Sequence, residues 1–156
     1  MPNLNLNSIT DALTQVTDSH AQVAMTRWGT ISDVANPKDG LPPAYPYVFY
    51  IIDQVNFTRR QFLVQITGIF QTRCKDTQAD ILKAQSDMAD IARDIYSQFI
   101  IQSGDSPAWS ITKDAEITGT PFVERFNDTV AGVTVQFPFE LDFPAGICYF
   151  PTKESS

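Results

Sequence analysis

Alternation of hydrophobic and polar residues between Asp128 and Phe143 is the clearest pattern in this chain. Its hydrophobic members are Val133, Val135, Phe137, Phe139, Leu141 and Phe143. Because side chains on a β-strand alternate between the two faces of a sheet, this pattern predicts one long strand with a single apolar face. Pro138 lacks a backbone N–H, so we expect the strand to lie at the edge of a sheet or to contain a bulge.

A first amphipathic helix is predicted from Ser8 to a stop at Gly29. Ser8 and Asp11 fit a capping box, in which two side chains bind backbone groups at the start of a helix. The apolar stripe of this helix consists of Ile9, Leu13, Val16, His20, Val23, Ala24 and Trp28. His20 is the only histidine, and its place in the stripe favours a packed structural residue over a catalytic one.

A second helix is predicted from Thr77 to Ile101. Thr77 and Asp80 fit another capping box, and apolar residues follow at spacings of three and four. Its exposed side would carry four aspartates, Asp80, Asp87, Asp90 and Asp94. These carboxylates lack the His or Glu partners of a metal centre in a helical bundle, so we interpret them as a solvated acidic surface.

Two strands are predicted before this second helix. β-branched and aromatic residues are dense in residues 47–53 and 61–71, which is typical of an antiparallel pair. The polar segment 54–60 predicts the loop between them, with Phe57 at its tip. An apolar side chain at that place either folds back on the hairpin or enters a socket on a neighbouring subunit. A proline-rich loop over 29–46 precedes the hairpin.

The remaining pattern completes an α+β fold. A third strand is predicted over 109–118, and residues 121–126 predict a short extension before the long final strand. The order of helix, strand, strand, helix, strand, strand predicts a single domain over 1–156. It would be a two-layer sandwich, in which two helices cover a mixed or antiparallel sheet of about four strands. Residues 1–7 and 144–156 are expected to be irregular.

One face of the predicted sheet is expected to stay polar. Thr134, Gln136 and Glu140 lie on the side of the final strand opposite its apolar residues. This face, or the strand edges, would then be free to meet neighbouring molecules. Phe is frequent, with 11 residues, and charged residues are only 19% of the chain, so apolar surface could also remain for partners. A Phe-rich core is the alternative explanation.

Charge disfavours nucleic acid as a specific partner. The formal net charge is -7, from 18 Asp and Glu against 11 Lys and Arg. Nucleic-acid-binding proteins gain affinity from cations that displace phosphate counterions, and this balance has the opposite sign. No apolar run reaches the roughly 20 residues of a membrane span, and the first residues do not resemble a secretory signal. We therefore expect no membrane partner and folding in a cytoplasm.

Candidate chemistry is sparse. Cys74 and Cys148 are expected to be free thiols, because a cytoplasm keeps thiols reduced, and neither has a Cys or His neighbour at zinc-ligand spacing. His20 has no Ser or Cys linked to it by a recognisable motif, and no Gly-rich phosphate loop is present. We therefore assign no catalytic, cofactor-binding or metal-ligating residue, and expect a protein that functions by assembly.

The order of elements and several short segments resemble a known family. The segments are Tyr45-Pro46-Tyr47-Val48 at the first strand, the return strand from Arg59-Arg60 to Thr72, the long helix, and Phe126-Asn127-Asp128-Thr129-Val130-Ala131-Gly132-Val133 before the final strand. Together they resemble the tail terminator or tail completion proteins of tailed bacteriophages. The proline-rich loop and Pro138 depart from that pattern.

The resemblance implies a structural virion protein. Members of that family are α+β subunits that form a ring, commonly of six copies, between the tail tube and the neck or connector of the head. The partners would be other copies of the chain and those tail and neck proteins, and no cofactor is implied. Two alternatives remain open at this point, another neck or tail ring protein and a monomeric module that binds a peptide at an exposed strand edge.

Candidate subunit contacts follow from charge and exposure. Arg59 and Arg60, beside Phe57 in the predicted hairpin loop, could meet the aspartates of the second helix on the next copy. Such a contact would set the orientation of the copies more than their affinity.

Overall fold

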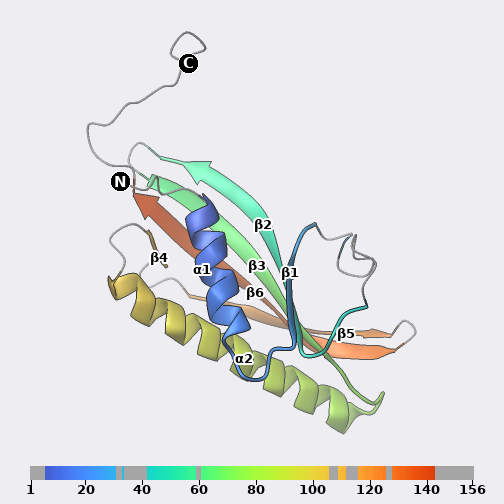
Figure 1. Ribbon diagram of the computed structural model, residues 1–156. Coiled ribbons are helices and arrows are strands. Elements are labelled where there is room, and N and C mark those ends of the chain that lie inside the picture. The colour runs from blue at the N-terminus through green and yellow to red at the C-terminus, as the bar shows by residue number, and fades with distance from the viewer. Residues whose placement is uncertain are drawn as a thin grey trace.

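The computed structural model describes residues 6–30, 33, 42–58, 61–105, 109–111, 116–125 and 128–142. It shows an α+β protein with two helices and one mixed sheet (Figure 1). The helices are α1 (Leu6–Asp18) and α2 (Gln78–Asp105), and the strands are β1 (Met25–Trp28), β2 (Tyr47–Phe57), β3 (Gln61–Arg73), β4 (Trp109–Ile111), β5 (Gly119–Arg125) and β6 (Thr129–Asp142).

The sheet contains six strands rather than the predicted four or so. β1 pairs in parallel with the first part of β2, and all other pairs are antiparallel. β3 lies between β2 and β6, and β5 and β4 pair with opposite ends of the outer side of β6. The observed order of elements is therefore helix, three strands, helix, three strands, and the predicted order is wrong.

β6 confirms the long predicted strand, but it is not an edge strand. Its register with β3 is unbroken and includes the pair Pro138 and Gln65, so no bulge is present there. The N–H of Cys74 donates to the Thr129 carbonyl at 3.1 Å, which directs the backbone of Thr129 toward β3. By the alternation of an antiparallel ladder, Pro138 directs its nitrogen to the other side. On that side β5 reaches only Val135 and β4 begins opposite Phe139, so the missing N–H falls between them.

α1 is shorter than predicted, and its second half is replaced by turns and β1. It begins at Leu6 and ends at Asp18, so two residues of the N-terminal segment expected to be irregular are helical. The Ser19 hydroxyl donates to the Val16 carbonyl at 2.7 Å, which competes with continuation of the helix. Trp28 reaches the core from β1, with its ring 4.9 Å from that of Tyr50.

α2 confirms the second predicted helix. The Asp80 N–H donates to the Thr77 hydroxyl at 3.3 Å, which is one half of the predicted capping box. The Asp80 carboxylate accepts from the Thr77 hydroxyl at 2.7 Å, whereas the Thr77 N–H donates to the Lys75 carbonyl. The helix continues to Asp105, four residues beyond the expected Ile101. The predicted strand over 109–118 is β4 in its first three residues, while residues 112–115 lie outside the described chain. The short extension is the seven-residue strand β5.

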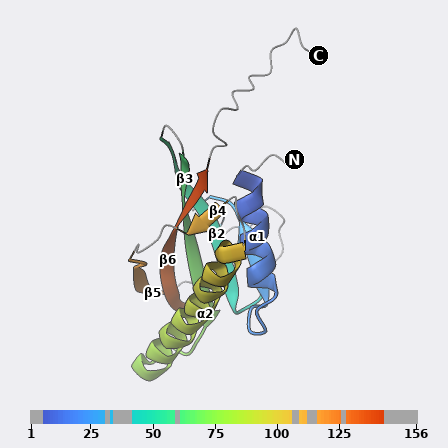
Figure 2. The same cartoon turned by 90° about the vertical axis from the view of Figure 1, so that its left-hand side faces the viewer.

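Both helices pack on one face of the sheet (Figure 2). Alternate residues of β3 and β6 face them, and together with β2 they form the main core. The core includes Ile9, Leu13 and Val16 of α1, Met88, Ile91, Ile95 and Phe99 of α2, and Tyr50, Ile66, Phe70, Val133, Val135, Phe137, Phe139 and Leu141 of the sheet. Thr17 ties α1 to the sheet, because its hydroxyl lies 2.6 Å from that of the fully buried Tyr50.

The opposite face of the sheet is not uniformly polar, contrary to the sequence-based expectation. Tyr47, Phe49 and Ile69 form a second buried cluster there, and Tyr45, Met25, Ile51 and Phe122 pack against it. The guanidinium of Arg73 lies 5.0 Å from the centre of the Tyr45 ring, within the range of a cation–π contact. Farther along the same face, Gln65 donates to Gln136 at 2.9 Å. Polar residues also occur beside the cluster, where Gln71 pairs with Tyr47 and Thr134 with Ile69.

Candidate interaction surfaces

The aspartates predicted as an acidic surface lie along α2, and each has a contact within the chain. Asp80 belongs to the cap described above. The others pair with Lys83 for Asp87 (2.7 Å), Arg93 for Asp90 (3.4 Å) and His20 for Asp94 (3.0 Å). Asp87, Asp90 and Asp94 nevertheless keep about half of their side-chain surface exposed. A partner could therefore reach these carboxylates, although Lys83 and Arg93 already neutralise part of the charge of Asp87 and Asp90.

His20 connects the turn after α1 to α2. Its Nε2 lies 3.0 Å from the Asp94 carboxylate, and its Nδ1 accepts a hydrogen bond from the Gln22 N–H at 3.2 Å. The acceptor role of Nδ1 makes Nε2 the protonated nitrogen, which donates to Asp94. Both ring nitrogens are engaged inside the chain, which is the arrangement expected for a structural histidine.

In the hairpin between β2 and β3, the strands are longer and the connecting loop is shorter than predicted. Residues 54–57 are part of β2, and the turn is closed by Thr58, whose N–H donates to the Gln61 carbonyl at 2.8 Å. Phe57 is therefore the last residue of a strand. Its ring contacts that of Phe62 at 4.9 Å, yet 70% of the residue stays exposed. Arg59 and Arg60 lie outside the described residues.

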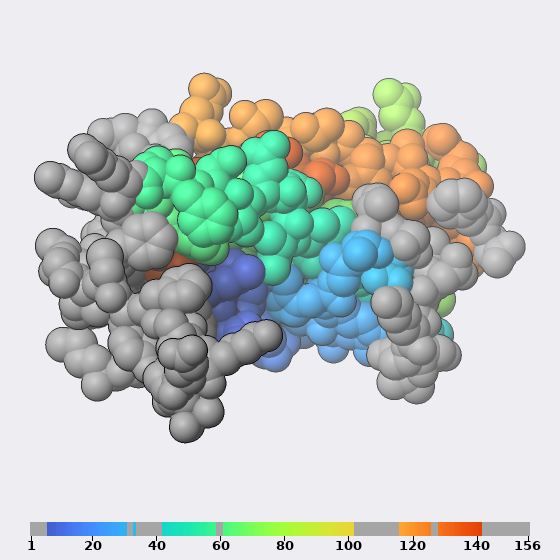
Figure 3. Space-filling view, turned by 90° about the horizontal axis from the view of Figure 1, so that it is seen from above, coloured from blue at the N-terminus to red at the C-terminus, as the bar shows by residue number. Residues whose placement is uncertain are grey.

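The hairpin and the first turns of α2 lie at opposite ends of the molecule (Figure 1). A contact between the hairpin and Asp80 therefore cannot form within one copy. Seen from above, the atoms of β2 are exposed beside those of α1 (Figure 3). Of the predicted interface residues, Phe57 therefore lies at the end opposite Asp80, while Asp87, Asp90 and Asp94 follow along α2.

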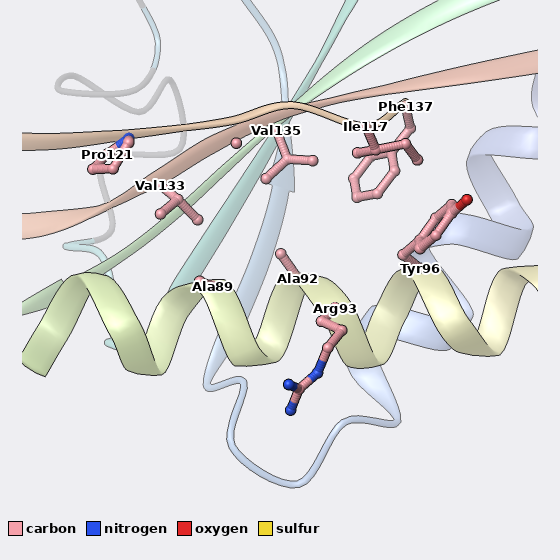
Figure 4. Close-up of a pocket in the computed structure, with 10 residues that line it drawn as sticks. Ala89, Ala92, Arg93, Tyr96, Ile117, Pro121, Val133, Val135 and Phe137 are labelled. Atoms are coloured by element: carbon pink, nitrogen blue, oxygen red, sulfur yellow. The ribbon is translucent and has the colours of Figure 1, made fainter. Parts of the chain in front are cut away.

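A cavity of about 430 Å³ lies between α2 and the sheet beside β5. It is lined by Ala89, Ala92, Arg93, Tyr96, Ile117, Gly119, Pro121, Val133, Val135 and Phe137. The alanines and Tyr96 face β6 across the opening, whereas the Arg93 guanidinium points away from it (Figure 4). The small residues Ala89, Ala92 and Gly119 leave the space. Sequence reasoning missed this cavity, because no single segment contains both of its walls.

The described residues hold little reactive chemistry. They contain no cluster of three or more His, Cys, Asp or Glu side chains able to hold a metal ion. Cys74 is a free thiol, as expected, whereas Cys148 lies outside the described chain. Partial burial, helped by the carboxylates of Asp80 and Asp76, raises the pKa of the Cys74 thiol, which weakens it as a nucleophile at neutral pH.

Neither α1 nor α2 is both long and apolar enough to cross a membrane. Comparison of the sequence with protein-family models found no matching family, and comparison with curated proteins found no significant match.

Proposed function

We propose that this chain is a tail terminator or tail completion subunit, which forms a ring at the head–tail junction of a tailed bacteriophage. The sequence resemblance described above motivates this proposal. In it, the two helices and the sheet act as the two layers of a rigid building block. The subunit would assemble in the host cytoplasm and contact the tail tube on one side and the neck or connector on the other.

The observation that carries the proposal is the separation of two unlike surfaces on one subunit. The hairpin end presents the exposed Phe57, which Arg59 and Arg60 follow in the sequence, while α2, with Asp80 in its first turn, begins at the other end and runs along the molecule (Figure 1). A ring forms when one patch of a subunit meets a different patch of the next copy and the rotation between copies closes. A hairpin that meets the aspartates of α2 on the next copy would satisfy the first requirement.

The charge of the chain also suits a ring through which DNA passes. Tight contacts between cations and phosphates would arrest a moving duplex, and a net charge of -7 limits such contacts. The same features fit another neck or tail ring protein, which differs from a terminator in its position rather than in its chemistry.

A monomeric peptide-binding module is the second candidate. β5 is paired on one side only within the described residues, and the cavity beside it is apolar. A peptide could add to such an edge as a further strand. Oligomeric state distinguishes the two candidates, because the module would function as single copies.

Native mass spectrometry and negative-stain imaging of the purified protein test the proposal. Closed rings of uniform size, weakened by the double substitution Arg59→Glu and Arg60→Glu, would support it. Gln15→Glu is the control, since it adds negative charge at an exposed position of α1, which carries none of the predicted interface residues. A monomer at every concentration, together with absence of the chain from purified virions, would contradict the proposal.

A further inference from the structure

We propose that neighbouring copies join by strand pairing, with the outer edge of β2 on one copy added to the outer edge of β5 on the next. This inference rests on the proposed ring, in which these two strand edges would form the contact between neighbouring copies. The added strand would also place apolar side chains of β2 over the cavity between α2 and β5. A single sheet would then continue from copy to copy.

The edge of β2 is open over its second half. β1 pairs only with Tyr47–Tyr50, and the hydrogen bond from the Gly29 N–H to the Tyr50 carbonyl, 3.2 Å long, is the last that the described chain makes to this side. Residues 51–57 therefore have a strand partner on the β3 side alone among the described residues. Unpaired strand edges are the usual template for pairing with another chain.

A bulge in β2 determines which side chains of this edge point to the helix side of the sheet. The register with β3 shifts between Ile52 and Gln54, so that Ile52, Val55 and Phe57 all lie opposite residues of β3 that face the helices. Without the extra residue, Val55 and Phe57 would point to the other face. Ile52 and Phe57 are 38% and 70% exposed, so an apolar row on the helix side of the open edge remains largely uncovered.

β5 offers a second open edge at the opposite side of the sheet. Each of its residues pairs with β6, and no described strand pairs with its outer side. Because hydrogen-bonded residues alternate along a ladder, the direction of Thr129 toward β3 leaves Gly119, Pro121 and Val123 with outward backbone groups. Pro121 has no N–H to offer, as is usual on an edge, but its carbonyl and the groups of its neighbours remain.

The two edges match in the faces that they present. Gly119 and Pro121 lie opposite Val135 and Val133, so the outward-bonding residues of β5 face the helices and line the cavity. By the same alternation, the residues of β2 whose backbone groups point to the open edge are Ile52, Val55 and Phe57, the apolar row. Residues opposite one another in a sheet share a face, so pairing the two edges would bring the apolar row to the cavity.

Three of the exposed large apolar residues lie at these two surfaces. Among the described residues, the large exposed hydrophobic side chains are Ile52, Phe57, Leu82, Ile100 and Ile101. The first two belong to the open edge of β2. Leu82 is seven residues before Ala89, so helical spacing places it on the flank of α2 that borders the cavity. The Gln85 amide, which donates to the Phe122 carbonyl at 3.0 Å, holds this flank against β5.

Cysteine pairs test the strand pairing directly. Asn56, Thr120 and Glu124 are exposed and lie on the sheet face away from the helices. In a background with Cys74→Ser and Cys148→Ser, a chain carrying Asn56→Cys and Thr120→Cys should form a ladder of disulfide-linked copies on mild oxidation if the edges are antiparallel. Asn56→Cys with Glu124→Cys should do so if they are parallel.

A bond within one copy is excluded by distance. β3 and β6 lie between the two strands, which places β2 and β5 about 14 Å apart at about 4.8 Å per strand spacing. A disulfide needs α-carbons within about 7 Å. Asn56→Cys with Gln15→Cys on α1 is the matched control and should give no ladder. Rings that form normally while neither test pair cross-links would overturn the strand pairing but leave the ring intact.

Substitutions at the edge give an independent readout. Phe57→Asp should convert rings to monomers, because it would place a charge over an apolar cavity, and Ala89→Trp should do the same by filling that cavity. Ile101→Asp is the control, an exposed apolar residue of α2 outside both surfaces. Circular dichroism should show the fold retained in all three. Unchanged rings in both Phe57→Asp and Ala89→Trp would contradict the inference, and a lack of rings in every variant and in the unmodified chain would contradict the proposed function as well.

Discussion

Replacing Thr17 by valine should destabilise the fold through one buried hydroxyl. The Thr17 hydroxyl donates to the Leu13 carbonyl at 2.7 Å, which uses its only hydrogen. The Tyr50 hydroxyl, 2.6 Å away, must therefore donate to Thr17. Valine keeps the shape of threonine but removes this acceptor. Both residues have no exposed surface, so water cannot replace the lost partner.

The expected loss follows from the cost of an unpaired buried donor. Such a group costs about 1–3 kcal/mol, so Thr17→Val should lower the free energy of unfolding by about 2 kcal/mol. Tyr50→Phe removes the donor itself and leaves Thr17 bonded to Leu13, so it should cost about 1 kcal/mol. The double variant leaves no unpaired hydroxyl. Its loss should be smaller than the sum of the single losses by about 1 kcal/mol or more.

Urea denaturation of the four proteins, followed by far-ultraviolet circular dichroism, measures these differences. Fluorescence of Trp28 is a local probe, because its ring lies 4.9 Å from that of Tyr50. Single losses that add without coupling would refute the reasoning, since they would mean that the two hydroxyls do not depend on one another.

Three further predictions concern stability. Burial raises the pKa of Tyr50 above its ordinary value of 10.0, so the stabilisation from the neutral hydroxyl is fully present below pH 10 and is lost as pH rises above it. The free energy of unfolding should therefore fall above pH 10 by up to about 1.4 kcal/mol per pH unit, and by less in Tyr50→Phe. Gly132→Ala should cost about 3 kcal/mol in chemical denaturation, because a β-carbon there would overlap the Phe70 carbonyl between the two central strands. Phe99→Ala should cost about 4 kcal/mol, because the ring is buried and packs on Phe139, whereas Ile101→Ala should change stability by less than about 0.5 kcal/mol.

The elements that the sequence predicted well are those with strong local signals. Alternation over many residues predicted β6, and the Thr77 cap with regular apolar spacing predicted α2. The first helix was wrong beyond Asp18. Val23 follows Val16 by seven residues and Trp28 follows Ala24 by four, which are helical spacings, but Val23 contacts the core from the connection after α1 and Trp28 from β1. A four-residue strand paired in parallel carries too short a pattern to recognise.

The surfaces depended on tertiary structure and were harder to predict. Phe57 is exposed, but it ends a strand instead of lying at a loop tip, and the face to which it points follows from a register shift between Ile52 and Gln54 that no sequence pattern revealed. The cavity arises where Ala89 and Gly119, thirty positions apart, leave space together. The contact of Asp94 depends on the placement of His20 beside α2, whereas Asp87 and Asp90 pair with Lys83 and Arg93 of their own helix.

The ring account requires that each copy uses two different surfaces, and a mixing experiment tests this most directly. One variant carries Arg59→Glu and Arg60→Glu in the hairpin, and a second carries Asp87→Arg and Asp90→Arg on α2. Each alone would place like charges together at every contact, whereas an equal mixture allows opposite charges to meet around an even-numbered ring. Native mass spectrometry should show rings lost in each variant and restored, with alternating composition, in the mixture. Rings that persist in both single preparations, or a mixture that stays monomeric while the unmodified chain forms rings, would contradict the account.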